Sequence, residues 1–159
     1  MKSITILKLV GSIIICQLAG VIGSIFTTRS IPTWYASLKK PIFNPPNWLF
    51  GPVWTGLFLL MGIAVFLVWQ KGMSFPQLKP ALIVFGIQLV FNILWSILFF
   101  GLRSPFIAFI EIIILWVLIL VTVLFFYPIS KTAGLLLFPY LLWVSFAAIL
   151  NFVLWRLNY

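Results

Sequence analysis

The sequence predicts an all-α membrane protein, a five-transmembrane-helix bundle in a single domain (residues 1–159) whose long first inter-helix loop caps a pocket. The first observation is composition: 64% of the residues are hydrophobic, only 7% are charged, and the mean hydropathy is +1.26. A soluble domain has roughly 25% charged residues, and a soluble fold cannot cover so much apolar surface. The second observation is that five segments are apolar over enough residues to cross a bilayer core of roughly 30 Å.

The five predicted spans cover residues 4–26, 52–69, 80–101, 105–126 and 132–155. Because backbone polar groups in lipid must be satisfied internally, each span is expected to be a helix. Gly72 can end the second span and Pro80 can begin the third, since a first-turn proline lacks only an N–H that would be unpaired anyway. Ser104 and Pro105 predict a helix cap and first turn, and hence a tight hairpin between the third and fourth spans. Pro128 separates the fourth span from the fifth.

The first link, residues 27–51, differs from the other links because it is long and holds four prolines and five aromatic residues. Disordered segments are poor in aromatic residues, and long ordered loops are usually functional. The composition therefore predicts a stiff loop that packs across the open end of the bundle. Arg29, Lys39 and Lys40 are expected at the mouth of the pocket, where they can meet carboxylates of a ligand.

The titratable residues exclude most enzyme chemistry. The chain has 10 Lys and Arg, one acid (Glu111), one cysteine (Cys16) and no histidine. These counts leave no His-based triad, carboxylate pair, disulfide or metal-ligand cluster, so we expect no metal and no required cofactor. Cys16 is expected to be a packing residue. For Glu111, pairing or hydrogen bonding within the bundle is favoured over proton relay or ligand contact.

The net charge of +9 comes from basic residues that occur singly or in pairs between apolar runs. Nucleic-acid binding needs a basic face or tract that follows the phosphates, and none is present. We therefore expect no nucleic-acid partner. Loops beside the anionic headgroups of a lipid bilayer explain the charge more simply.

Polar, small and aromatic residues recur at helical spacing in four of the spans, and residues three or four positions apart share a helix face. The four faces are Ser12, Cys16, Gly20 and Ser24; Trp54, Phe58, Gly62 and Trp69; Gln88, Asn92 and Ser96; and Tyr140, Trp143, Ala147 and Asn151. Helix packing and hydrogen bonds explain such faces without a ligand, and for the first span packing is the favoured interpretation. Trp116, inside the fourth span, is expected to face lipid or a neighbouring helix.

Depth along the helices brings three of these faces together. At a rise of 1.5 Å per residue, Trp54 and Asn92 fall in the half of the bundle beneath the first loop, with Trp143 nearer the middle. A concave, mostly apolar site with a few polar groups is typical of a small-ligand pocket. Rings of Trp, Tyr and Phe suit a flat, apolar guest. The spacing therefore predicts a pocket for a planar ligand.

Three motifs follow one another along the chain. The first matches the pattern WYxxLxKPxxxPPxxxFxxxW and runs from Trp34-Tyr35 to Trp54. The second holds Phe91-Asn92, Trp95-Ser96 and Phe99-Phe100, and the third holds Pro139-Tyr140, Trp143, Phe146-Ala147, Leu150-Asn151 and Trp155. In these motifs the chain resembles the TspO/MBR family. That family comprises the tryptophan-rich sensory proteins of bacteria and the mitochondrial translocator protein, once called the peripheral benzodiazepine receptor.

The resemblance implies a five-helix bundle, usually a homodimer, that binds porphyrins and isoquinoline-type ligands beneath the first loop. The lining residues that it implies are Tyr35, Trp54, Phe58, Asn92, Trp95, Ser96, Trp143 and Ala147. Some members are proposed to degrade protoporphyrin by oxidative or light-driven chemistry, and the implicated tryptophans would be Trp54 and Trp143 here. The expected location is the bacterial cell membrane.

The favoured function is an integral membrane receptor or sensor that binds protoporphyrin-type tetrapyrroles. A metal-free porphyrin fits better than haem, because a chain without histidine lacks the usual axial ligand. The alternative is a light- or oxygen-dependent porphyrin-degrading enzyme. A tetrapyrrole transporter ranks lower, since five spans leave little room for the inverted repeats of secondary transporters. A purely structural membrane protein is the remaining alternative.

Overall fold

The structure is a computed structural model that describes residues 2–72 and 76–159. Within these ranges it contains helices and connecting turns, and no β-strand. The elements are α1 (Lys2–Ser30), the π-helix η1 (Ile31–Tyr35), α2 (Asn47–Trp69), α3 (Leu78–Ser96), the π-helix η2 (Ile97–Gly101), α4 (Pro105–Ile129), α5 (Lys131–Leu136) and α6 (Phe138–Asn158). In the described residues, five helical segments are long and apolar enough to cross a membrane: Ile4–Tyr35, Asn47–Trp69, Leu78–Gly101, Pro105–Ile129 and Lys131–Asn158. The predicted all-α bundle of five spans is therefore confirmed.

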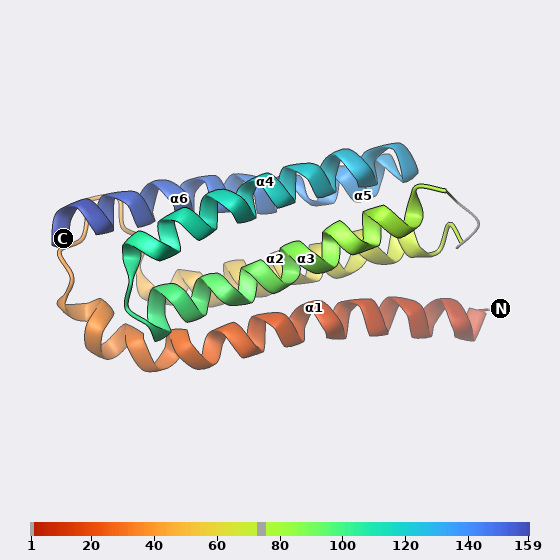
Figure 1. The fold of residues 1–159 in the computed structure, drawn as a ribbon. Helices are drawn as coiled ribbons and strands as arrows, with labels where there is room; N and C mark the ends of the chain where they lie inside the picture. Colours follow the sequence, from red (N-terminus) through yellow and green to blue (C-terminus); the bar gives the residue numbers. More distant parts are fainter. Residues whose placement is uncertain (1, 73–75) are drawn as a thin grey trace.

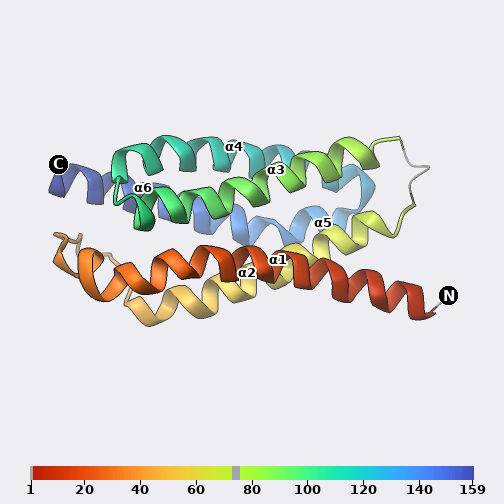
Figure 2. The same cartoon turned by 60° about the horizontal axis from the view of Figure 1, so that its bottom comes forward.

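The spans lie roughly along one long axis and alternate in direction (Figure 1). α1 forms one outer side of the bundle, α2 and α3 lie in the middle, and α4 lies with α5 and α6 on the opposite side. One end, which we call the loop end, holds η1, the α3–α4 turn and the C-terminus. The other end, the far end, holds the start of α1, the end of α2 and α5, as the rotated view in Figure 2 also shows.

The predicted end of the first span is wrong, because the helix continues far beyond residue 26. α1 and η1 follow one another without a break to Tyr35, so the link to α2 is much shorter than the predicted 27–51 segment. The hydroxyls of Thr27 and Thr28 donate to carbonyl oxygens four residues earlier, which satisfies them within the helix. Pro32 lies in the first turn of η1, where a missing N–H is tolerated.

The start of the second span also differs from the prediction. α2 begins at Asn47 rather than at Pro52. Pro46 has an extended backbone (φ −62°, ψ 143°) and ends the loop. Pro52 lies inside the helix, where its ring removes one backbone hydrogen bond. α3 similarly begins at Leu78, slightly before the predicted start at Pro80.

The predicted fifth span, residues 132–155, is divided into two helices. α5 ends at Leu136 and α6 begins at Phe138. Pro139 lies in the first turn of α6, and its missing N–H cannot continue the hydrogen-bond pattern of α5. α4 extends to Ile129, past its predicted end at residue 126, and includes Pro128.

The predicted hairpin between the third and fourth spans is present, but the predicted side-chain cap is not. Arg103 has a left-handed backbone with φ 52°, which is uncommon for a residue other than glycine. The N–H of Leu102 donates to the carbonyl of Ile97 at 2.8 Å. Ser104 precedes α4, but its side chain makes no cap hydrogen bond. Backbone bonds to η2 therefore close the turn.

Small residues bring the helices close together toward the far end. A Cβ atom added to Gly62 of α2 would lie 2.7 Å from the Cα atom of Ile13 on α1. A Cβ atom added to Gly134 of α5 would lie 3.0 Å from the Cα atom of Tyr127 on α4. Backbones approach this closely only where a side chain is missing. The far half of the bundle is therefore a dense core.

The outer faces of the bundle are apolar. Ile14, Leu18 and Ile22 project from α1 with about half of each side chain exposed, and α4 exposes Ile110 and Ile114 in the same way. Water would make so large an apolar surface a site of aggregation, whereas lipid chains solvate it. The protein is a multi-pass integral membrane protein in contact with a lipid bilayer.

Candidate functional site

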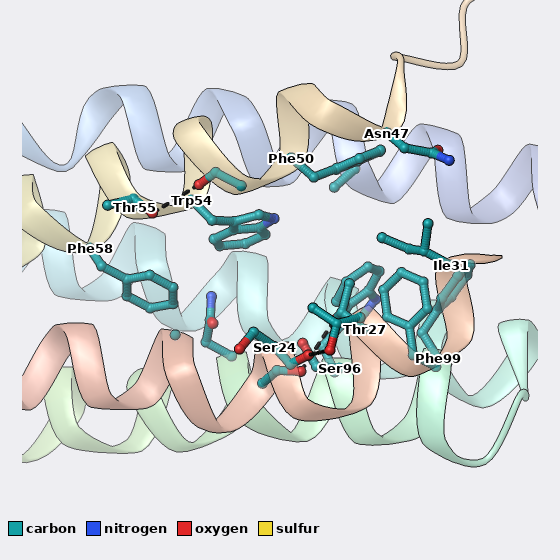
Figure 3. Close-up of a pocket in the computed structure, with 18 of the residues that line it drawn as sticks. Ser24, Thr27, Ile31, Asn47, Phe50, Trp54, Thr55, Phe58, Ser96 and Phe99 are labelled. Carbon is teal, nitrogen blue, oxygen red and sulfur yellow. Dashed lines mark hydrogen bonds between the residues drawn. The ribbon is translucent and has the colours of Figure 1, made fainter.

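A cavity of about 460 Å³ lies in the loop-end half of the bundle. α1, η1, α2, α3, η2 and α6 all contribute to its wall, and Figure 3 shows α1 and α2 facing each other across it. The structure brings all eight predicted site residues to this wall: Tyr35, Trp54, Phe58, Asn92, Trp95, Ser96, Trp143 and Ala147. Their part in ligand binding stays a prediction.

Aromatic rings form most of the wall and contact one another around it. The Trp54 ring lies with its centroid 5.7 Å from that of Phe58 and tilted by 31°. On the other side, the Trp95 ring stacks on Phe99 with centroids 5.1 Å apart and an interplanar angle of 18°. Such offset and tilted pairs stabilise each other beyond the effect of burial. These contacts between rings therefore hold the aromatic side chains of the wall in place.

The predicted polar face of α3 forms a hydrogen-bonded network with α6. The side-chain N–H of Asn92 donates to the Tyr140 hydroxyl at 2.7 Å, and that hydroxyl donates to Gln88 Oε1 at 3.1 Å. All three side chains are buried. Polar groups within a membrane span are costly unless they find partners. This network therefore fixes Asn92 in the cavity wall and Tyr140 next to it.

The tryptophans inside the spans differ in the hydrogen-bond partners of their indole N–H groups. Trp95 Nε1 donates to Asn151 Oδ1 at 3.1 Å, and Trp116 Nε1, on α4, donates to Ser145 Oγ at 2.7 Å. Trp116 thus faces a neighbouring helix, which was one of its two predicted environments. Trp143 Nε1 is buried and has no hydrogen-bond partner among the described residues. Trp143 lines the cavity, and of these three tryptophans it is the one whose indole N–H has no partner in the described part of the chain.

The wall that α1 contributes was missed by the sequence analysis. Gly20, Gly23 and Ser24 line the cavity, although the favoured interpretation of this face was packing alone. A Cβ atom added to Gly20 would lie 2.6 Å from the Phe58 ring, and one added to Gly23 would lie 3.0 Å from Ser96 Oγ. This face of α1 therefore packs against α2 and α3 and also lines the cavity. The spacing of small residues on this face indicates close approach between helices, but it does not say what lies opposite each of them.

The basic residues predicted at the mouth do not line the cavity. The Lys40 ammonium lies 4.8 Å from the centre of the Tyr35 ring, and Lys39 is held through its backbone by Asn158 of α6. Arg29 is exposed on the last turn of α1. None of residues 36–46 is among the lining residues, so the loop as a cover of the pocket stays a prediction.

Glu111 does not have the partner that was predicted for it. Its side chain is buried on α4, and neither carboxyl oxygen has a hydrogen-bond partner in the described part of the chain. It is also absent from the cavity wall. Cys16 is fully buried in the core, as expected of a packing residue. Among the described residues, no group of three or more His, Cys, Asp or Glu gathers around a point that a metal could occupy.

The fold and the site define a class of protein, a multi-pass helical membrane protein with an aromatic cavity inside one half of its bundle. The model of one family, TspO/MBR, matches residues 12–156 of the chain. The chain belongs to the TspO/MBR family, as the motifs predicted.

Named relatives support this assignment across nearly the whole chain. The tryptophan-rich protein TspO of Archaeoglobus fulgidus is 48% identical over 153 residues, which is 96% of this chain and 98% of the relative. The tryptophan-rich sensory protein of Cereibacter sphaeroides is 38% identical over 126 residues, 79% of this chain and 77% of the relative. The translocator protein of Bos taurus is 34% identical over 152 residues, 94% of this chain and 89% of the relative.

Proposed function

We propose that this protein is a membrane receptor or sensor that binds protoporphyrin-type tetrapyrroles and isoquinoline-type planar ligands in its loop-end cavity. The observation that carries the proposal is the aromatic wall, in which η1, α2, α3, η2 and α6 contribute rings around a cavity of about 460 Å³. Volumes of roughly 300–1,000 Å³ are usual for small-ligand sites. The name of one relative, a tryptophan-rich sensory protein, supports a sensing role.

The chemistry of the wall favours a flat, largely apolar guest. The indole rings of Trp54 and Trp95 present broad faces that stack on a planar ring system. The unpaired N–H of Trp143 supports the same proposal, because a buried donor without a partner costs about 1–3 kcal/mol. A carbonyl or carboxylate oxygen of the ligand would remove that cost. The ligand is expected to be metal-free, since the chain offers no histidine to a haem iron.

Titration of the purified protein with protoporphyrin tests the proposal. We expect saturable quenching of tryptophan fluorescence, and Trp143→Ala is expected to weaken the affinity severalfold because it removes both a stacking ring and the free donor. Trp69→Phe is the matched control, since Trp69 lies near the far end under Lys8 and does not line the cavity. Quenching that never saturates beyond the level of empty micelles would overturn the proposal.

The same cavity also allows a test of the enzymatic alternative. Trp54 and Trp143 both line it, from α2 and α6, so a bound porphyrin would lie near both indoles. Illuminated turnover to a defined product, lost in the Trp54→Phe/Trp143→Phe double variant, would favour a porphyrin-degrading enzyme. Bleaching at an equal rate in the double variant would leave the receptor as the function.

We also infer that the protein is a homodimer, which rests on the family to which it belongs. Its apolar outer faces are open to a second copy as well as to lipid. Native mass spectrometry from detergent is expected to show a species of twice the 18.2 kDa chain mass. A monomer under conditions that preserve porphyrin binding would contradict the inference.

A further inference from the structure

We propose that ligands enter and leave the cavity sideways, directly from the bilayer, through a slot between α1 and α2. The inference rests on the proposed function, because it concerns the same cavity and the same planar ligands. The inference starts from the exposure of the residues that line the cavity. The exposed ones belong to two helices only, and they are Val21, Ser24 and Thr28 of α1 and Asn47, Trp48, Gly51 and Thr55 of α2.

The rest of the cavity wall is covered. The lining residues of η1, α3, η2 and α6 are all buried or half-buried, including Tyr35, Asn92, Phe99 and Leu150. The opening therefore lies on the side of the bundle, along the α1–α2 slot. Figure 3 shows Ser24 and Thr27 of α1 on one side of this opening and Phe50 and Thr55 of α2 on the other.

The slot has a closed inner end. Gln17 Nε2 of α1 donates to the carbonyl of Thr55 on α2 at 3.0 Å, and Gly20 lies directly against the Phe58 ring. Deeper still, the two helices come into backbone contact at Gly62. From this crossing they diverge toward the loop end, as Figure 2 shows. The gap on the loop-end side of this crossing is the path along which we propose that a flat guest slides.

The depth of the slot places it beside lipid chains. Thr55 lies eight residues after the start of α2 at Asn47, which corresponds to about 12 Å along a helix with a rise of 1.5 Å per residue. The slot thus extends from the level where α2 begins, with Trp48 at its outer end, into the apolar part of the bilayer. Tryptophan prefers this interfacial level. A ligand dissolved in the membrane meets the opening without first entering water.

The rim of the slot offers little resistance to an apolar guest. The hydroxyls of Ser24, Thr28 and Thr55 donate to carbonyls of their own helices, at 2.7, 2.8 and 2.9 Å. Because these groups are already satisfied, a passing ring system does not strip them of hydrogen bonds. The route therefore favours planar ligands that partition into lipid over polar solutes.

The alternative route runs from water at the loop end, where several contacts hold the loop in place. The amide side chain of Asn158 bonds both the N–H of Lys39 at 2.8 Å and its carbonyl at 3.0 Å. The Tyr35 hydroxyl donates to Asn44 Oδ1 at 2.7 Å, and the Phe43 ring packs on Phe146. Entry past the loop would require several of these contacts to break.

Gly51→Leu tests the route because it puts a side chain into the slot. A Cβ atom on Gly51 meets nothing within 4 Å, so the variant is expected to fold. Protoporphyrin exchange is measured by stopped-flow tryptophan quenching in phosphatidylcholine vesicles. A plugged slot is expected to slow both association and dissociation, by about tenfold for each additional 1.36 kcal/mol of barrier. A variant that only weakened the binding site would instead dissociate faster. A slower or a faster dissociation rate therefore tells a plugged slot from a damaged site.

Two control variants complete the experiment. Gly56→Leu adds the same side chain to the same helix, also into open space, but outside the cavity wall, and is expected to leave both rates unchanged. Asn158→Ala frees the loop and is likewise expected to leave the rates unchanged. Wild-type dissociation rates in Gly51→Leu, or faster exchange in Asn158→Ala, would overturn the sideways route alone. Absence of saturable quenching in the wild-type protein would overturn the proposed function and the route together.

Discussion

The two halves of this bundle are built from the same apolar residue types, yet one half is solid and the other is hollow. Toward the far end, Gly62 faces the backbone of Ile13, and the buried alanines Ala64, Ala81 and Ala133 lie in the core. Toward the loop end, large rings meet rings, as in the Phe50–Trp143 contact at 6.3 Å. Small residues opposite backbone close the space between two helices, whereas the rings around the cavity leave space between the helices that carry them.

The halves also differ in how their side chains are held. In the cavity wall, hydrogen bonds fix large side chains, with Asn92 bonded to Tyr140 and Trp95 to Asn151. Toward the far end, the Phe85 and Phe126 rings stack with centroids 5.6 Å apart, so van der Waals packing holds them. Packing alone cannot hold the side chains around the cavity in place, because rings beside empty space lack neighbours on one side. Polar bonds replace the missing contacts.

The largest effect is expected from Gly62→Ala in the solid half. The new Cβ atom would lie 2.7 Å from the Cα atom of Ile13, and a backbone atom cannot move aside without shifting a helix. Overpacking of this kind typically lowers the free energy of unfolding by about 1–3 kcal/mol, and we expect a loss in the upper part of that range. The loss is measured as a lower unfolding temperature in detergent. Gly86→Ala on α3 is the control, since its Cβ atom meets nothing within 4 Å. Equal stability of the two variants would contradict the close-packing argument.

The next effect is expected from Tyr140→Phe behind the cavity wall. The change leaves the Asn92 amide and Gln88 Oε1 without their shared hydroxyl partner in a buried site. Unsatisfied buried groups cost about 1–3 kcal/mol, so thermal stability and porphyrin affinity are expected to fall together. Tyr127→Phe, at an exposed site on α4, should change neither. A Tyr140→Phe variant with full stability would show that the network does not hold the wall.

A third comparison separates two tryptophans of the wall. Trp95→Phe breaks the bond to Asn151 and is expected to lower stability by about 1 kcal/mol. Trp143→Phe removes an N–H that has no partner in the described chain, so stability without ligand should not fall. Porphyrin affinity of Trp143→Phe should nevertheless drop by roughly fivefold, the effect of one lost hydrogen bond. Thermal unfolding with and without protoporphyrin distinguishes these outcomes, and identical behaviour of the two variants would argue against the free donor.

Periodicity and motifs were enough to predict the helical class, the number of spans and eight of the residues around the cavity. Hydropathy reports burial in lipid, and spacing of three or four residues reports a shared face, so Trp54, Asn92 and Trp143 were brought together correctly. Helix ends were predicted less well. Pro52 and Pro128 were taken as boundaries, but both lie within helices, because tertiary packing compensates for one lost backbone bond.

The wall formed by α1 illustrates a different limit. A face of small residues such as Gly20 and Gly23 predicts close approach between helices, but spacing does not say what lies opposite each glycine. In this fold Gly20 meets the end of a ring and Gly62 meets backbone. What lies opposite each glycine depends on the angle at which α1 and α2 cross. That angle is set by the packing of all the helices in the bundle. Sequence patterns therefore predicted the contact but not the cavity beside it.

Gly20→Ala is expected to have only a small effect on stability and is the sharpest contrast with Gly62→Ala. Its Cβ atom would lie 2.6 Å from Phe58 Cε2, closer than the contact at Gly62, but the neighbour is a ring edge that can rotate toward empty space. We therefore expect a stability loss below about 1 kcal/mol together with weaker porphyrin binding, since the displaced ring occupies part of the cavity. Thermal unfolding and fluorescence titration of the same sample measure both quantities. Loss of stability as large as in Gly62→Ala would mean that the loop-end half is packed as tightly as the far half.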